Sequence, residues 1–152
     1  MIKIIKASSK YYSQVIALRY EMLKDVNNLL TDNFSDDFRT ATEAFFTEGN
    51  QTTLLAMDDN AAIGCATICY IMLMPTYSHP TGKRAHIMNV YTRKKYRRQG
   101  VAKRLMEALL KEAKESGITH ISLDATKEGR LLYDKLGFKT ADGGMEIIFK
   151  GC

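Results

Sequence analysis

Cysteine, proline and long apolar runs are all scarce in this sequence, and each absence excludes a class of protein. The three cysteines, Cys65, Cys69 and Cys152, are an odd number without the spacing of a disulfide framework. No further Cys or His lies close to Cys65 and Cys69 in the sequence, so we expect buried free thiols and no metal site. No apolar stretch approaches the roughly 20 residues that a membrane span needs.

The N-terminal residues also lack the character of a targeting segment. Residues 2–6 alternate apolar and basic side chains, which is typical of a strand, whereas a signal peptide needs a longer apolar stretch. We therefore expect a cytoplasmic protein with no membrane partner. The net charge of +5 favours an anionic partner without identifying it.

Linkers, repeats and low-complexity segments are absent as well, which indicates one domain over residues 1–152. A chain of 152 residues buries roughly 70% of the surface that its unfolded form exposes, enough for one sizeable core without disulfides or metals.

The apolar pattern predicts alternating strands and helices. Period-two alternation and short apolar runs predict strands over residues 2–6, 52–57, 61–74, 84–92, 118–123 and 145–149. Period-3.6 patterns with capping residues predict helices over about 9–25, 35–49, 101–116 and 127–136. Ser8 or Ser9 is expected to cap the first helix and Ser35 the second. Hairpins mixed with helical crossovers imply a mixed sheet with helices on both faces, in the order β-α-α-β-β-β-α-β-α-β-β.

The connection before helix 101–116 has the features of a phosphate-binding segment. Gly100 permits an unusual backbone turn and close approach of a ligand, and Ala102 is small. The first amides of a helix have no intrahelical partners, and Arg97 and Arg98 add positive charge. The sequence contains neither GxxxxGK[ST] nor GxGxxG, which excludes a P-loop and leaves a Rossmann site unsupported. A solvated basic connection is the alternative for this segment taken alone.

Two motifs together resemble a known family. Residues 97–102 match the pattern [RQ]-x-x-G-x-[GA], and residues 89–96 resemble the strand that usually precedes this pattern. Residues 131–138 resemble LYxKxGF, the second signature of the same family. This pair is similar to the GNAT N-acetyltransferase superfamily. The resemblance implies an α/β (α+β) single-domain fold with a mixed, mostly antiparallel sheet of about seven strands, and acetyl-CoA or coenzyme A as cosubstrate.

The resemblance also implies which residues hold the cofactor. The pyrophosphate is expected on the backbone amides that follow the motif's first residue, Arg97; these belong to Arg98, Gln99, Gly100, Val101, Ala102 and Lys103. The backbone of Val90, Tyr91 and Thr92 is expected to pair with pantetheine. Thr126 stands where the family often has Asn; it keeps a hydroxyl for a cofactor contact but lacks the amide.

Acid–base roles fall on two residues. Tyr133 occupies the family's general-acid position, and a phenol is protonated at neutral pH. Strict alternation along 84–92 puts His86, Met88, Val90 and Thr92 on one face, and several family members have a base at the position of His86. The alternative for Tyr133 is a packing aromatic, and for His86 a surface or structural histidine.

The acceptor predicted from these features is a primary amine, on a small molecule or a peptide, attacked directly in a ternary complex. In this fold the first two helices and the segment before the last strand usually line the acceptor site, here with Tyr20, Glu21, Phe34, Phe38 and residues 140–145. Residues 74–82, with Tyr70, Met72, Met74 and Tyr77, would form an apolar wall.

Two other functions remain open. A non-catalytic acyl-CoA-binding module would keep the phosphate segment without the chemistry. A nucleic-acid-binding domain is disfavoured because the cations are spread over several surfaces and no known motif appears, so no nucleic acid partner is expected. A homodimer is expected only by analogy with similar enzymes.

Overall fold

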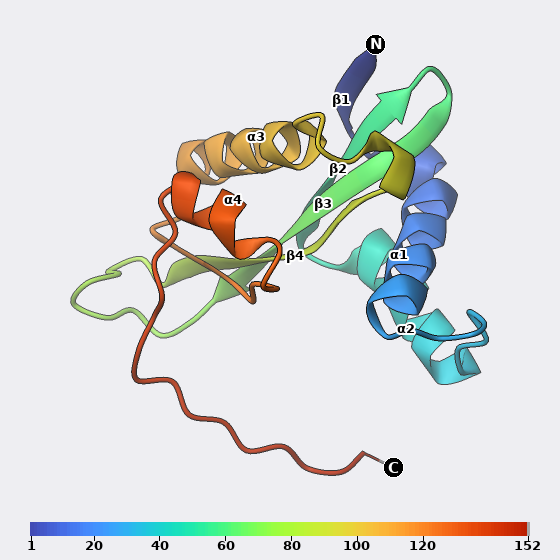
Figure 1. Cartoon of the computed structure of the whole chain (residues 1–152). Coiled ribbons are helices and arrows are strands. Elements are labelled where there is room, and N and C mark those ends of the chain that lie inside the picture. Colours follow the sequence, from blue (N-terminus) through green and yellow to red (C-terminus); the bar gives the residue numbers. More distant parts are fainter. Residues whose placement is uncertain (152) are drawn as a thin grey trace.

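A five-stranded sheet with the order β1-β2-β3-β4-β5 forms the centre of the molecule (Figure 1). The computed structural model describes residues 1–151. The strands are β1 (Ile2–Lys6), β2 (Gln51–Asp58), β3 (Ala61–Met72), β4 (Lys83–Thr92) and β5 (His120–Leu123). The helices are α1 (Tyr12–Val26), α2 (Asp36–Glu48), α3 (Val101–Glu115) and α4 (Arg130–Lys135), with 3-10 turns at Ser9–Tyr11 and Lys94–Tyr96. β4 and β5 are parallel and the other pairs antiparallel, so the predicted mixed, mostly antiparallel sheet is confirmed.

Helices cover both faces of the sheet, as predicted. α3 packs on one face because its apolar residues recur at helical spacing, and Leu105, Met106, Leu109 and Ala113 are fully buried. α4 lies beside α3, and α1 and α2 cover the opposite face (Figure 1). Val15 and Leu18 of α1 are buried there against Leu55 and Cys65. We call these the α3 face and the α1 face of the sheet.

The two predicted N-terminal caps differ in outcome. The Ser35 hydroxyl accepts a hydrogen bond of 3.2 Å from the Phe38 amide, which confirms this cap of α2. Ser8 makes no side-chain capping bond, and the segment begins as a 3-10 turn before α1 starts at Tyr12. The expected α-helical start at residue 9 is therefore wrong by one turn.

A bulge in β4 overturns the predicted alternation of that strand. Two residues, Asn89 and Val90, stand opposite one residue of β3, and Asn89 has a left-handed φ of 61°. Ala85 and Ile87 pack on the α3 face, and so does Val90 beyond the bulge. His86 therefore points to the α1 face, opposite Val90. The prediction that His86 and Val90 share a face was wrong, because one inserted residue exchanges the two faces.

The predicted last strand, Met145–Phe149, does not form. Residues 139–151 have no regular structure and are exposed, and in Figure 1 they run away from the sheet and helices. The sheet has five strands instead of about seven, and the outer edge of β5 pairs with no other strand within residues 1–151. Alternation of apolar and polar residues shows that a segment can form a β-strand, but the strand forms only where a neighbouring strand is available for hydrogen bonding.

Candidate active site

A split between β4 and β5 opens the sheet next to the phosphate-binding segment. The two strands pair only from Arg84 and His120 to Ile87 and Leu123. β4 continues for five more residues, 88–92, while the chain after β5 turns away toward α4. The β4 edge beyond Ile87 thus pairs with no strand on the β5 side in the described chain. Its backbone groups are available to an extended ligand.

Six consecutive backbone amides at the end of this split have no protein acceptor. The amides from Arg98 to Lys103 donate no hydrogen bond within residues 1–151; the next amide, of Arg104, donates to the Gly100 carbonyl at 3.1 Å. Arg98 and Gly100 have left-handed φ values of 61° and 77°, so successive N–H groups curve around one point. No side chain caps α3, and a Cβ added to Gly100 would meet nothing within 4 Å. This concave row of amides at a helix N-terminus suits a phosphate group.

The arginine at the start of this segment braces it. Arg97 Nε donates to the Thr92 carbonyl at 2.8 Å, and its guanidinium lies 5.7 Å from the Tyr91 ring centre. The Tyr91 hydroxyl in turn donates to Asp25 of α1 at 2.8 Å. Burial, and then the hydrogen bond to Asp25, raise the pKa of Tyr91, which keeps the phenol protonated. The segment is thereby tied to both β4 and α1.

Thr126 has a local role at the start of α4. Its hydroxyl accepts a hydrogen bond of 3.1 Å from the Gly129 amide. A Cβ added to Gly129 would lie 2.9 Å from Cε2 of the Tyr133 ring. Glycine at 129 is therefore explained by the close approach of Tyr133, a reason that the sequence did not reveal.

Tyr133 is half-buried at the edge of the α3-face core. Its ring packs against Phe138 with 6.0 Å between ring centres. Burial raises the pKa of the Tyr133 phenol, so it stays protonated to a higher pH than a free tyrosine. Tyr133 lines a groove of about 940 Å³ that follows β5, and His86 lines the same groove. Both candidate acid–base residues therefore line this groove, although Tyr133 packs on the α3 face and His86 points to the α1 face.

His86 has two partners on the neighbouring strand and the residue that follows it. Its Nδ1 lies 2.7 Å from Ser122 Oγ, and its Nε2 lies 3.8 Å from Asp124 Oδ2. Ser122 thus contacts one ring nitrogen and the exposed carboxylate of Asp124 lies near the other. Sequence reasoning missed both partners because they depend on the register of β5 beside β4.

The predicted acceptor residues separate into two groups. Tyr20, Phe34 and Phe38 form an aromatic cluster between α1 and α2, with ring centres 5.1–6.1 Å apart. Glu21 accepts from Arg93 Nε at 3.2 Å, and Asp25 accepts from Tyr91. Both carboxylates are engaged in bracing the phosphate-binding segment.

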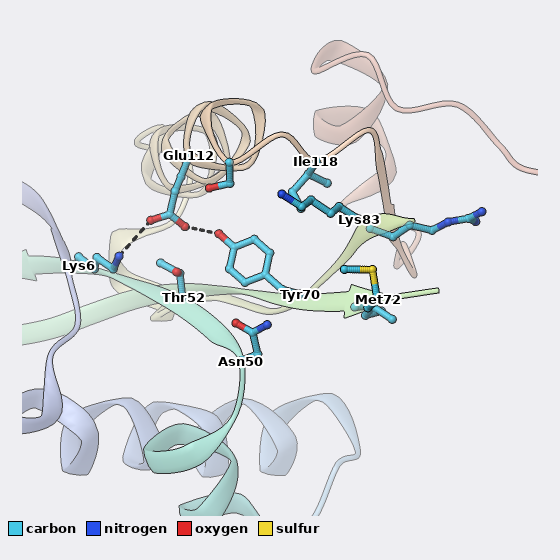
Figure 2. A pocket seen from close by; sticks show the side chains of 11 residues that line it. Lys6, Asn50, Thr52, Tyr70, Met72, Lys83, Glu112 and Ile118 are labelled. Carbon is cyan, nitrogen blue, oxygen red and sulfur yellow. Dashed lines mark hydrogen bonds and ion pairs between the residues drawn. The ribbon is translucent and has the colours of Figure 1, made fainter. Parts of the chain in front are cut away.

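Tyr70 lies on the α3 face, away from the aromatic cluster of α1 and α2. Figure 2 shows it in a separate cavity of about 410 Å³ on the α3 face, near the C-terminal end of α3. Its hydroxyl donates to Glu112, which also pairs with Lys6 at 3.3 Å. Burial, with the hydrogen bond to Glu112, raises the pKa of Tyr70 to about 12. These groups satisfy one another, which is typical of a structural polar cluster.

Other predicted features can be placed within residues 1–151. Cys65 is a buried free thiol and Cys69 a half-buried one, while Cys152 lies outside the described residues. No three His, Cys, Asp or Glu side chains in the described part of the chain gather as metal ligands would. None of the helices in that part combines the length and the apolar character that crossing a membrane requires.

Comparisons with known proteins match nearly the whole chain. A model of the acetyltransferase (GNAT) family matches residues 19–138, and no curated protein matches in sequence. A crystal structure of a predicted acetyltransferase with acetyl-CoA from Clostridium acetobutylicum is 32% identical, with a TM-score of 0.86 over 97% of this chain and 96% of that one. A GCN5-related N-acetyltransferase from Ralstonia eutropha JMP134 is 22% identical, with a TM-score of 0.81 over 97% and 99% of the two chains. Glucosamine-6-phosphate N-acetyltransferase from Arabidopsis thaliana is 18% identical, with a TM-score of 0.71 over 99% of each chain.

Proposed function

Because the chain belongs to the acetyltransferase (GNAT) family, whose members are acyltransferases, we propose that it transfers an acetyl group from acetyl-CoA to a primary amine. The observation that carries this proposal is the row of unbonded amides from Arg98 to Lys103. A relative 32% identical to this chain has been crystallised with acetyl-CoA, which supports the same ligand here.

The geometry suits the different parts of coenzyme A. The amide row would hold the pyrophosphate, which is anionic and lies against the positive end of the α3 dipole. The free edge of β4 at Val90, Tyr91 and Thr92 would pair with the pantetheine amides. The Thr126 hydroxyl accepts a bond from Gly129 and keeps its O–H donor for a contact with the cofactor.

Acetyl-CoA supplies an activated acetyl group, and the chain's own residues manage the protons. A neutral amine is required for attack, and His86 accepts the proton that the acceptor ammonium loses, directly or through water. The new C–N bond forms as the C–S bond breaks, and the attacking nitrogen releases its second proton to solvent. The Tyr133 hydroxyl donates its proton to the departing sulfur and is reprotonated from solvent. An amide on the β4 edge stabilises the negative charge that develops on the carbonyl oxygen.

Thermal shift measurements with acetyl-CoA test the cofactor site. Ligand at about 100 times its dissociation constant should stabilise the protein by roughly 2.7 kcal/mol. Gly100→Asp should abolish this shift, because it places a carboxylate among the amides that receive the pyrophosphate.

Gly117 provides a matched control for that substitution. It lies just beyond the other end of α3 and has a φ of 78°, and a Cβ added to it would meet nothing within 4 Å, as at Gly100. Gly117→Asp therefore imposes the same backbone strain outside the site and should leave the acetyl-CoA shift intact. The absence of a shift in the unaltered protein would overturn the proposal. A shift without acetylation of any amine would favour a non-catalytic acyl-CoA-binding module.

We also infer that the chain forms a homodimer. Four large apolar side chains, Met145, Ile147, Ile148 and Phe149, are 78–99% exposed in an extended segment. Exposed apolar side chains in an extended segment promote aggregation unless another surface buries them. The same holds for the outer edge of β5, which pairs with no other strand within residues 1–151. The segment of one copy could add to the β5 edge of a second copy, and two-fold symmetry would then cover both features in both copies.

A further inference from the structure

An arginine on the α1 face of the sheet lacks an acidic partner. Arg19 of α1 is half-buried, and its side chain makes one hydrogen bond within residues 1–151, from Nη1 to Asn89 Oδ1 over 3.4 Å. A guanidinium has five N–H donors, so most of them have no acceptor in this part of the chain. Desolvation by burial lowers the pKa of Arg19, which indicates that the protein leaves this charge poorly compensated.

Other arginines in the same region are paired. Arg93 donates to Glu21 at 3.2 Å, and Arg39 donates to the carbonyls of Phe34 and Asp32 at 3.2 and 2.6 Å. Half-buried cations are usually paired in this way because desolvating an unpaired charge is unfavourable. Arg19 departs from that rule at a position next to the β4 bulge.

The position of Arg19 places it on the acceptor side of the site. Asn89, its partner, forms the bulge that precedes the proposed pantetheine edge. Arg19 also lies near Cys69: burial raises the pKa of that thiol, and the Arg19 charge opposes the rise. Cys69 stands opposite His86 in the strand register, so the side chains of these two residues share the α1 face. Arg19 and the candidate base therefore border one area.

A second unpartnered cation lies on this face. Arg84 is two residues before His86, so both side chains point to the same side of β4. Its Nε is buried and has no hydrogen-bond partner in the described chain. The carboxylate that pairs with His86, Asp124, is itself exposed. The candidate base thus has two cations, Arg19 and Arg84, and one exposed carboxylate, Asp124, in its surroundings.

We propose that the acceptor is an amine that also carries an oxyanion group, a carboxylate or a phosphate, and that Arg19 binds this group while the amine meets the acetyl carbon. This inference rests on the proposed acetyltransferase function. Arg19 suits the role because its fork of donors matches the two oxygens of a carboxylate or phosphate. Arg84 adds positive charge on the side of His86 away from the bulge.

Acetylation of matched acceptors tests the inference. The probes are L-amino acids, the amides of the same amino acids, and amino sugars with and without a phosphate ester, each at saturating acetyl-CoA. We expect kcat/KM to be about 10- to 100-fold higher for the member of a pair that carries the oxyanion, as charge-assisted hydrogen bonds contribute on that scale. The amino-acid and amino-sugar arms distinguish a carboxylate from a phosphate.

Arg19→Met should remove this preference, mainly by raising KM for the anionic acceptors, and should leave the acetyl-CoA thermal shift unchanged. Lys114→Met removes the same charge from an exposed position on α3 and is the matched control. An equal loss toward both members of every pair would assign Arg19 a structural role only and overturn the inference.

If Arg19→Met does not fold, the same comparison of acceptors on the unaltered protein tests the inference. If acceptors without the oxyanion group are acetylated as efficiently as acceptors that carry it, the inference about Arg19 is overturned and the proposed function still stands. Failure to bind acetyl-CoA, or to acetylate any amine, would instead overturn the proposed function itself.

Discussion

Tyr133 is the residue that we propose as the proton donor to the departing sulfur. Tyr133→Phe removes the hydroxyl but keeps the ring that packs against Phe138. We expect kcat to fall by about 100-fold, the scale of lost general-acid catalysis, with the acetyl-CoA thermal shift retained. An unchanged kcat would exclude Tyr133 from the mechanism.

The pH dependence of kcat provides a second measurement of the same residue. Because burial raises the pKa of Tyr133, the protonated acid persists above the ordinary tyrosine value of about 10. Activity should therefore decline with rising pH only beyond that value, and this decline should be missing in Tyr133→Phe.

The proposed base, His86, should determine the opposite limb of the pH profile. Acid protonates the imidazole and removes the base, so kcat/KM should fall as the pH is lowered. His86→Gln should abolish this acidic limb, because glutamine keeps polar groups at this position but cannot accept the proton. An acidic limb that persists in His86→Gln would show that the base lies elsewhere.

At the scale of elements, α4 depends on a glycine that helix propensity alone would disfavour. Alanine is more favourable than glycine in a helix by about 1 kcal/mol, yet a Cβ at residue 129 would lie 2.9 Å from the Tyr133 ring. Gly129→Ala should therefore displace Tyr133 and lower kcat more than it changes acetyl-CoA affinity. Single-turnover kinetics with a thermal shift would separate these effects, and a more stable variant with full activity would contradict this account.

The bulge of β4 is the second decisive element. Its extra residue turns His86 toward the α1 face and Val90 toward the α3 face, so one strand would serve both the proposed acceptor side and the proposed cofactor side. Asn89 suits this position because asparagine tolerates a left-handed conformation better than most residues. Its side chain also bonds to Arg19 and Thr67, which fixes the bulge to α1 and β3.

The whole molecule exposes a segment that a second copy could cover. Light scattering on the full chain should give twice the 17.2 kDa of one chain. Ile147→Glu should shift the protein toward the monomer because a buried carboxylate in the pairing segment is unfavourable. Lys150→Glu, which changes charge in the same segment without removing an apolar side chain, should leave the dimer intact. A single 17.2 kDa species in the unaltered protein would contradict the homodimer.

Much of the architecture could be predicted from local patterns. α3 was predicted almost to the residue, since Leu105, Leu109 and Ala113 recur at helical spacing and Gly117 ends the helix. The Ser35 cap and the β2–β3 hairpin follow in the same way from neighbouring residues. The glycine turn before α3 also belongs to this class, because Gly100 and the helix start lie next to each other.

Other features were decided only when distant segments met. The side to which His86 points depends on a bulge defined against β3, and its partners Ser122 and Asp124 depend on the register of β5. The sequence does not show which side chains surround Arg19. Only the packing of α1 on the sheet shows that no carboxylate within residues 1–151 pairs with it. The sequence alone thus determined the helices and the strands of the central sheet, and the glycine turn that begins α3, because these depend on contacts within a few residues. The tertiary structure decided that residues 145–149 find no partner strand within residues 1–151, and which side chains share a face, because burial, register and charge pairing arise between residues that are far apart along the chain.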